Sequence, residues 1–326
     1  MTEQVRKRHF GGWILLMALI VIGVGVYLNR EPIYEYYRGV TYQPSSEMAR
    51  IRTDLQLTER GTSLFNTAQP ALEEATEFNA YCRDGETETA VLGCYVGGNI
   101  HVYNITDERL NGIRELTTAH ELLHAKWARM SEKEKVALVE PLTRVFEENQ
   151  DFLGNEIDNY DVNEKQEELY VRAGTEVKNL PAVLEKHYAE IFRDQDLIVD
   201  FYDSYIEVFR ALAAEMDGLK AEMDAIGEEV NAKIAEYEQR AAQLNADIVS
   251  FNSCAEVAGC FEREEDFYER REALVAEQLA LEEMYEEINS LVADYNVKVE
   301  IYNADVLEKE KLNTIINSAA KPQEIE

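Results

Sequence analysis

An apolar run near the amino terminus contains no charged residue from Phe10 to Leu28. As a helix that rises about 1.5 Å per residue, this run nearly spans the ~30 Å hydrocarbon core of a bilayer, so it predicts a transmembrane helix. Arg6, Lys7 and Arg8 precede the run, and this basic excess favours a cytoplasmic tail over residues 1–9. Because no small-x-small cleavage site closes the run, we expect a signal anchor and not a cleaved signal peptide.

The carboxy-terminal third repeats apolar residues every three or four positions. One such seam runs from Leu212 to Phe251, and a second, with apolar residues seven apart, runs from Leu274 to Val306. The stretch 253–260 interrupts the pattern. Two heptad helices joined by a short loop favour an antiparallel coiled-coil hairpin, which we expect over residues 196–312, with a length on the order of 60 Å. An intermolecular coiled coil is the alternative, and residues 313–326 are expected to form a disordered tail.

A period of two marks the middle of the chain. Residues 91–96 and 99–105 alternate as two strands would, and Gly97 and Gly98 between them indicate a hairpin turn. On such a strand, His101 is expected to face solvent and not to bind a metal. Residues 31–81 show two or three helical stretches broken near prolines and a glycine, and they predict a helical scaffold without identifiable chemistry.

Helical periodicity flanks this hairpin on its carboxy-terminal side. Apolar residues recur at helical spacing in 107–128, and Ser131 with Glu134 forms a capping box for a following helix. Residues 163–177 show an i+4 apolar repeat that ends before Pro181. The predicted fold is therefore mostly α with a small β-hairpin, an α+β core over residues 82–195.

Charge and cysteine content narrow the classes of function. The chain has 326 residues and a net charge of −32, which argues against nucleic acid and anionic membrane surfaces as partners. Four cysteines occur as two pairs that are close in sequence, which predicts two local disulfides in an oxidising compartment. The predicted pairs are Cys82 with Cys94 and Cys254 with Cys260.

The motif that carries chemistry is His120-Glu121-Leu122-Leu123-His124. Residues four apart lie on the same face of a helix, so the two imidazoles are placed to bind one metal ion. The Glu121 carboxylate lies one position further round, where it can reach a water molecule on that metal. The alternative is a surface helix with two incidental histidines.

A hydrolytic zinc site needs a third protein ligand and one open position. No third histidine follows at short spacing, and His187 is distant in sequence, so we expect a carboxylate from the helix over residues 163–177. Glu168 is the preferred candidate, and Glu167 and Glu164 are the alternatives.

At these residues the chain resembles the gluzincin metallopeptidases. Thr117–His124 is similar to their active-site helix, and Glu167–Pro181 is similar to the glutamate helix of the minimal, ImmA/IrrE-type gluzincins. The resemblance covers roughly residues 86–192, about a third of the chain. The Asp or Asn that often follows the glutamate ligand by a few residues is missing here.

This resemblance implies one catalytic Zn²⁺ and a general base. The implied ligands are His120, His124 and Glu168, and the implied base is Glu121. It also implies an edge strand above the metal that pairs with an extended peptide. A group that stabilises the oxyanion is expected, and the candidates are Tyr160, Tyr170, Arg172, His187 and Tyr188.

The sequence therefore predicts a single-pass membrane protein with an extracytoplasmic zinc metallopeptidase domain, more typical of an endopeptidase than of an exopeptidase. Its expected substrate is a protein or peptide, and the coiled-coil hairpin would select or position protein partners. The alternative is a structural or adaptor protein of the cell envelope in which the hairpin is the functional part and the metal site is vestigial.

Overall fold

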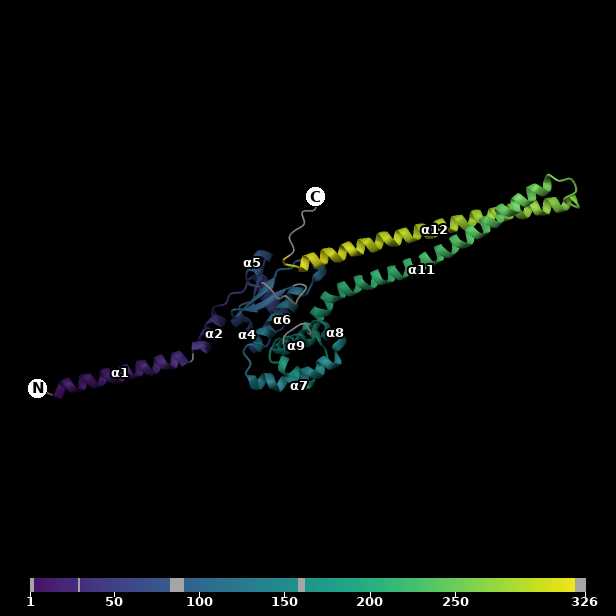
Figure 1. The fold of residues 1–326 in the computed structure, drawn as a ribbon. Helices are drawn as coiled ribbons and strands as arrows, with labels where there is room; N and C mark the ends of the chain where they lie inside the picture. The colour runs from purple at the N-terminus through teal and green to yellow at the C-terminus, as the bar shows by residue number, and fades with distance from the viewer. Residues whose placement is uncertain (1–2, 29, 83–90, 158–161, 320–326) are drawn as a thin grey trace. The chain divides into compact units, whose positions relative to one another are not determined.

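The computed structural model describes residues 3–28, 30–82, 91–157 and 162–319. The chain divides into two compact units, and each is described separately (Figure 1). The first unit comprises residues 1–208 and 313–326, and the second comprises residues 209–312. The second unit is therefore an insertion between two parts of the first.

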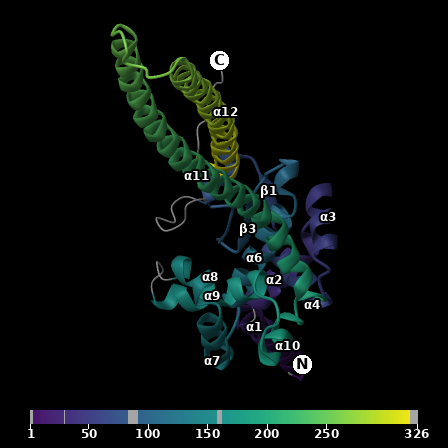
Figure 2. The same cartoon turned by 90° about the vertical axis from the view of Figure 1, so that its right-hand side faces the viewer.

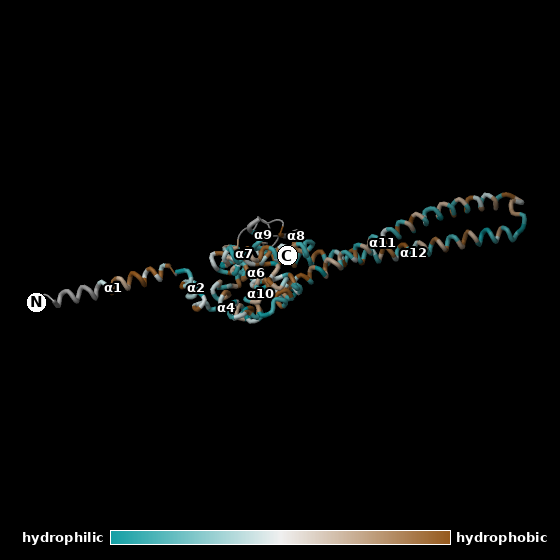
Figure 3. The backbone as a smooth tube through the Cα atoms, turned by 90° about the horizontal axis from the view of Figure 1, so that it is seen from below, coloured by the Kyte–Doolittle hydropathy of each residue, from teal (hydrophilic) through white to brown (hydrophobic). Residues whose placement is uncertain are grey.

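The first unit begins with α1 (Glu3–Leu28) and α2 (Arg30–Thr41). Figure 3 shows apolar residues along the described part of α1. Among the described residues, no single helix is both long and apolar enough to cross a membrane. The stretch Trp13–Leu28 and α2 meet this requirement only together, as a pair bent by 70°.

A three-stranded sheet lies at the centre of the first unit. Its strands are β1 (Ala71–Glu73), β2 (Gly93–Val96) and β3 (Asn99–Tyr103), in the order β1-β3-β2. The β2–β3 pair is antiparallel and is the predicted hairpin, with positive φ angles of 59° at Gly97 and 83° at Gly98 in its turn. β1 pairs in parallel with β3 and lies within residues 31–81, which were predicted as helical stretches separated by turns, with no strand. Three residues are too few to display a period of two, so the sequence pattern did not reveal this strand.

Two helices cover opposite faces of this sheet (Figure 1). On one face, Ile100 and Val102 are fully buried in the same core as residues of α6 (Ile113–Trp127). On the other face lies α5 (Ala75–Tyr81), which the Cys82–Cys94 disulfide ties to β2. Both predicted cysteine pairs are confirmed.

The expected exposure of His101 is wrong. His101 is only 6% exposed, because the Tyr81 ring of α5 stacks on it with ring centroids 4.2 Å apart. Its Nδ1 also lies 2.7 Å from Glu73 Oε1. The alternation placed His101 correctly on the face opposite Ile100, but it gave no sign that a helix covers that face.

The remaining helices of the first unit complete the core on the α6 side of the sheet. The capping box predicted at Ser131 is present at the start of α7 (Glu132–Glu148), where Ser131 Oγ accepts from the backbone N–H of Glu134. Before α6, the chain forms a short 3₁₀ turn and then bends at Gly112, whose φ is 91°. An added Cβ on Gly112 would lie 3.2 Å from Phe201 Cδ1, so a close approach also favours glycine there. Figure 2 shows the group formed by α7 to α10. The remaining helical elements of the first unit are α3 (Ser46–Asp54), α4 (Glu59–Ala68), η1 (Glu108–Leu110), α7 (Glu132–Glu148), α8 (Gln150–Ile157), α9 (Val162–Glu176) and α10 (Ala182–Tyr188).

The second unit is an antiparallel pair of long helices, α11 (Gln195–Ala255) and α12 (Glu264–Ile316), both of which extend beyond it into the first unit. Ion pairs join them, and the residue numbers on α12 fall as those on α11 rise. These pairs are Glu222 with Lys298 at 2.6 Å, Lys233 with Glu287 at 2.9 Å and Arg240 with Glu277 at 2.8 Å. The Cys254–Cys260 disulfide closes the connecting loop.

The predicted seam on α12 is only partly covered. Leu281 and Ile288 are buried, whereas Tyr285 and Val292 are 53% and 40% exposed. The antiparallel pairing is thus present, and coiled-coil packing along the full length of the two predicted seams remains a prediction.

The predicted disordered tail needs a correction. α12 continues to Ile316, and Ser318 and Asn79 of α5 exchange two hydrogen bonds of 2.7 and 2.9 Å. Residues 320–326 lie outside the described part of the chain.

Candidate metal centre

Helix α6 places the motif residues between the sheet and α9. Its buried apolar residues include Ile113, Leu122 and Leu123, and they hold the helix in the core. Thr117 and Thr118 are also buried. Each hydroxyl donates to a helix carbonyl four residues earlier, at 2.7 and 2.6 Å. The helix can therefore be enclosed on both sides without leaving these hydroxyls unpaired.

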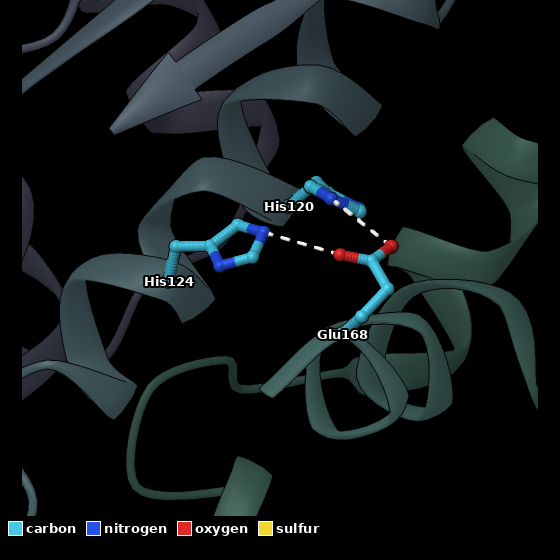
Figure 4. A group of neighbouring side chains, drawn as sticks. All are labelled: His120, His124 and Glu168. Carbon is cyan, nitrogen blue, oxygen red and sulfur yellow. Dashed lines mark ion pairs between the residues drawn. The ribbon is translucent and has the colours of Figure 1, made fainter. Parts of the chain in front are cut away.

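The structure brings Glu168 of α9 to the two motif histidines, as predicted (Figure 4). His120 Nε2 lies 3.8 Å from Glu168 Oε1, and His124 Nε2 lies 3.5 Å from Glu168 Oε2. One ligand atom from each residue lies within 4.8 Å of the others. This group therefore has the geometry to hold a metal ion.

These separations are informative because they suit an ion better than direct hydrogen bonds. Nitrogen and oxygen ligands about 2.0–2.2 Å from a tetrahedral zinc lie roughly 3.3–3.5 Å from each other. A hydrogen bond would bring the same atoms to about 2.7–3.2 Å. Two imidazoles and one carboxylate also form the donor set of a hydrolytic zinc site, so the residues present fit zinc.

The two alternative carboxylates lie elsewhere. Glu167 Oε1 lies 2.8 Å from His124 Nδ1, the ring nitrogen that faces away from Glu168. A carboxylate in this position fixes the tautomer and the orientation of a metal-binding histidine. Glu164 is exposed. The geometry therefore favours Glu168 over Glu167 as the carboxylate that could bind a metal, and Glu167 lies on the other side of the His124 ring.

Burial and neighbouring charges shift the pKa values of His120, His124 and Glu168 in different directions. Burial lowers the pKa of His120 to about 4, and the His124 and Arg172 charges act in the same direction. Burial also disfavours the charged form of His124, but Glu167 and Glu168 outweigh it and raise its pKa to about 10. Burial opposes ionisation of Glu168 as well, yet His120, His124 and Arg172 lower its pKa to about 2. Without a metal, a proton on His124 balances the carboxylates, so metal binding must release it.

The described candidates for oxyanion stabilisation make other contacts. Tyr170 Oη lies 3.1 Å from His187 Nε2, and the Tyr188 hydroxyl donates to the Tyr170 carbonyl at 2.6 Å. Both tyrosines are fully buried. Arg172, one turn after Glu168, donates to both oxygens of Glu176 at 2.9–3.1 Å. Arg172 is the member of this group whose charge acts on His120 and Glu168, and Tyr160 lies outside the described residues.

Glu121 is 5% exposed and lies against β2. An added Cβ on Gly93, the first residue of β2, would lie 2.8 Å from Glu121 Cγ and 2.6 Å from Thr117 Cγ2. The missing side chain at Gly93 therefore leaves room for the Glu121 carboxylate beside the strand. Gly93 was not among the residues expected at the site, although a glycine inside a strand often marks a close approach.

Gly93→Ala should displace Glu121, because the stiff, buried Thr117 side chain cannot easily move away. We expect a loss of about 1–3 kcal/mol in the free energy of unfolding, measured by denaturant titration. Gly227→Ala in α11 is the control, because nothing lies within 4 Å of its added Cβ and a helix-interior alanine should raise stability by up to about 1 kcal/mol. Equal stability of the Gly93→Ala variant and the unmodified chain would contradict this account of the strand.

No protein-family model, curated protein or solved structure matches this chain. What supports a function for this site is therefore its geometry and the resemblance of its motif residues.

Proposed function

We propose that this chain is a zinc-dependent peptidase anchored in a membrane. The observation that carries the proposal is the convergence of His120, His124 and Glu168 around a space of metal-ion size, with Glu121 on the same helix. The donor set favours zinc over magnesium or calcium, which prefer oxygen ligands.

Two of the chain's residues, Glu121 and Glu167, would assist a bound zinc ion in peptide hydrolysis. A bound zinc ion would supply a Lewis acid for the scissile carbonyl and lower the pKa of a water molecule towards neutrality. Glu121 would accept the proton of the attacking water and transfer it to the leaving amine. Glu167 would hold His124 in the tautomer that presents Nε2 to the metal.

The position of β2 supports an extended peptide as the substrate. Among the described strands, β2 pairs with β3 alone, so its other edge has no strand partner within that part of the chain. Gly93 of β2 lies against Glu121, so a peptide added along this edge would pass the proposed base. Such recognition uses backbone hydrogen bonds and suits an endopeptidase.

Two features of the chain support a location outside the cytoplasm. The apolar residues of α1 from Trp13 to Leu28 are exposed, as they would be for an anchor that contacts lipid. The Cys82–Cys94 and Cys254–Cys260 disulfides are typical of an oxidising compartment. We therefore propose that the chain after α1 is extracytoplasmic, and that the α11–α12 pair contacts a protein substrate or partner.

Metal analysis of the purified full chain tests the function directly. We expect about one zinc per chain, loss of peptide cleavage after chelation, and recovery when zinc is returned. His120→Ala should prevent zinc binding and cleavage. A chain that binds no zinc, and in which His120→Ala changes nothing, would instead support the adaptor function of the helical pair.

A further inference from the structure

Helix α2 exposes an apolar face. At 100° per residue, five exposed side chains occupy an arc of roughly 160° on one side of the helix. They are Ile33 (49% exposed), Tyr34 (57%), Tyr36 (74%), Tyr37 (63%) and Val40 (62%).

The opposite face of α2 is polar and is bound to the rest of the first unit. Arg38 Nη2 donates to Gly98 O at 2.9 Å and to Asn99 Oδ1 at 2.6 Å, both at the β2–β3 turn. Arg129, just after α6, donates from Nε to Glu35 Oε1 at 2.8 Å. The usual arrangement of a surface helix, with apolar residues inward, is therefore reversed.

We propose that the apolar face of α2 lies in the interfacial layer of the bilayer that holds α1. This inference depends on the proposed anchor and adds a second membrane contact to it. Only one residue separates α1 from α2, so α2 starts where the apolar run leaves the hydrocarbon. Tyrosine rings favour this depth because they combine an apolar ring with a hydroxyl that stays hydrated.

The charges of α2 distinguish this arrangement from a second crossing of the membrane. Arg30, Glu31, Glu35 and Arg38 lie within twelve residues, and burying four charges in hydrocarbon is unfavourable. They also cancel, so attraction to anionic lipid contributes little, and the net charge of −32 opposes it. The contact should therefore form on zwitterionic lipid through burial of apolar side chains.

A second copy of the chain is a weaker candidate for covering this face. Stable protein interfaces use roughly 20–30 residues a side, whereas α2 offers five side chains next to a membrane anchor. A lipid surface needs no such area, because α1 already holds the helix at the bilayer.

The contact would orient the proposed active site. Arg129 bonds Glu35 of α2 and also donates to the Tyr95 hydroxyl of β2 at 2.7 Å. Arg38 holds the turn that joins β2 to β3. Strand β2 would therefore keep a fixed orientation relative to the bilayer surface. The site would then favour substrates held near that surface.

Tryptophan quenching by brominated lipids tests the position of α2 in the full chain. The chain has two tryptophans, Trp13 in α1 and the buried Trp127. The variant Trp13→Phe with Tyr36→Trp places a reporter on the exposed face, and Trp13→Phe alone gives the background. Trp13→Phe with Val136→Trp is the matched control, because Val136 is 69% exposed on α7. Each protein is placed in nanodiscs of zwitterionic phosphatidylcholine whose acyl chains carry bromine at either a shallow or a deep position.

We expect Tyr36→Trp to be quenched by the shallow bromines at least about twofold more than Val136→Trp, and only weakly by the deep ones, as for a helix buried about 5–10 Å into the interface. Raised salt should leave this quenching unchanged. Quenching of Tyr36→Trp equal to that of Val136→Trp would overturn the inference, as would stronger quenching by deep than by shallow bromines.

The native Trp13 separates this failure from failure of the anchor. If Trp13 is quenched and Tyr36→Trp is not, α1 is inserted and only the α2 contact is wrong. If neither is quenched, the anchor itself is wrong, and the α2 inference fails with it.

Discussion

Glu121→Gln should leave zinc bound at about one ion per chain and reduce peptide cleavage by about 10²–10⁴-fold, the range typical of losing a general base. Glutamine keeps the shape of the buried side chain but cannot accept the proton of the attacking water. Because Glu121 is outside the candidate ligand group, zinc affinity should change little. The measurements are single-turnover cleavage of a peptide and zinc content of the same preparation.

Glu115→Gln is the control for this prediction. Glu115 is in the first turn of the same helix and is outside the candidate ligand group. The Glu115→Gln variant should therefore cleave peptides as the unmodified chain does. Unchanged cleavage by Glu121→Gln would remove Glu121 from the mechanism, and loss of zinc in this variant would show that the carboxylate is a ligand.

The second large effect is expected when Glu164, Glu167 and Glu168 of α9 are replaced one at a time by glutamine. Glu168→Gln should weaken zinc binding by more than about 100-fold, because it removes a ligand oxygen that carries charge. Glu167→Gln should weaken it by about 10–100-fold, the usual cost of losing the carboxylate behind a ligand histidine. Glu164→Gln should have no effect, because this side chain is exposed. Competition with a chromophoric zinc chelator measures all three.

The order of these three effects decides which carboxylate is the ligand. If Glu167→Gln weakens zinc binding more than Glu168→Gln does, the roles of the two residues are exchanged. If none of the three variants changes zinc binding, the third ligand is none of these carboxylates.

Local patterns predicted those parts of the site that depend on spacing along one element. The i, i+4 spacing of His120 and His124 and the glycine turn of the β2–β3 hairpin are such cases. The choice of Glu168 over Glu167 was harder, because neighbouring residues on a helix point only about 100° apart. Packing of α9 against α6 decides which one meets the histidines, and that packing has no signature in the sequence.

Features that depend on contacts between distant segments were missed for the same reason. β1 is recognisable only through its pairing with β3, and His101 is buried by a helix that comes earlier in the chain. Gly93 is informative only once Glu121 is known to lie beside it. Each needs the position of a partner 20 or more residues away, which neither periodicity nor composition contains.

The insertion of the second unit also has a consequence for the order of folding during synthesis. The bonds between Asn79 and Ser318 join residues 239 positions apart, so this part of the first unit can close only after α11 and α12 have been made. The long helices depend mainly on local contacts and can form first. Before the contact between Asn79 and Ser318 forms, the chain between these two residues is a loop that has to close. If the second unit folds first, this loop is effectively shorter by 104 residues, which changes the entropic cost of closing it by only roughly 0.5 kcal/mol. The insertion therefore delays completion of the first unit while leaving its stability almost unchanged.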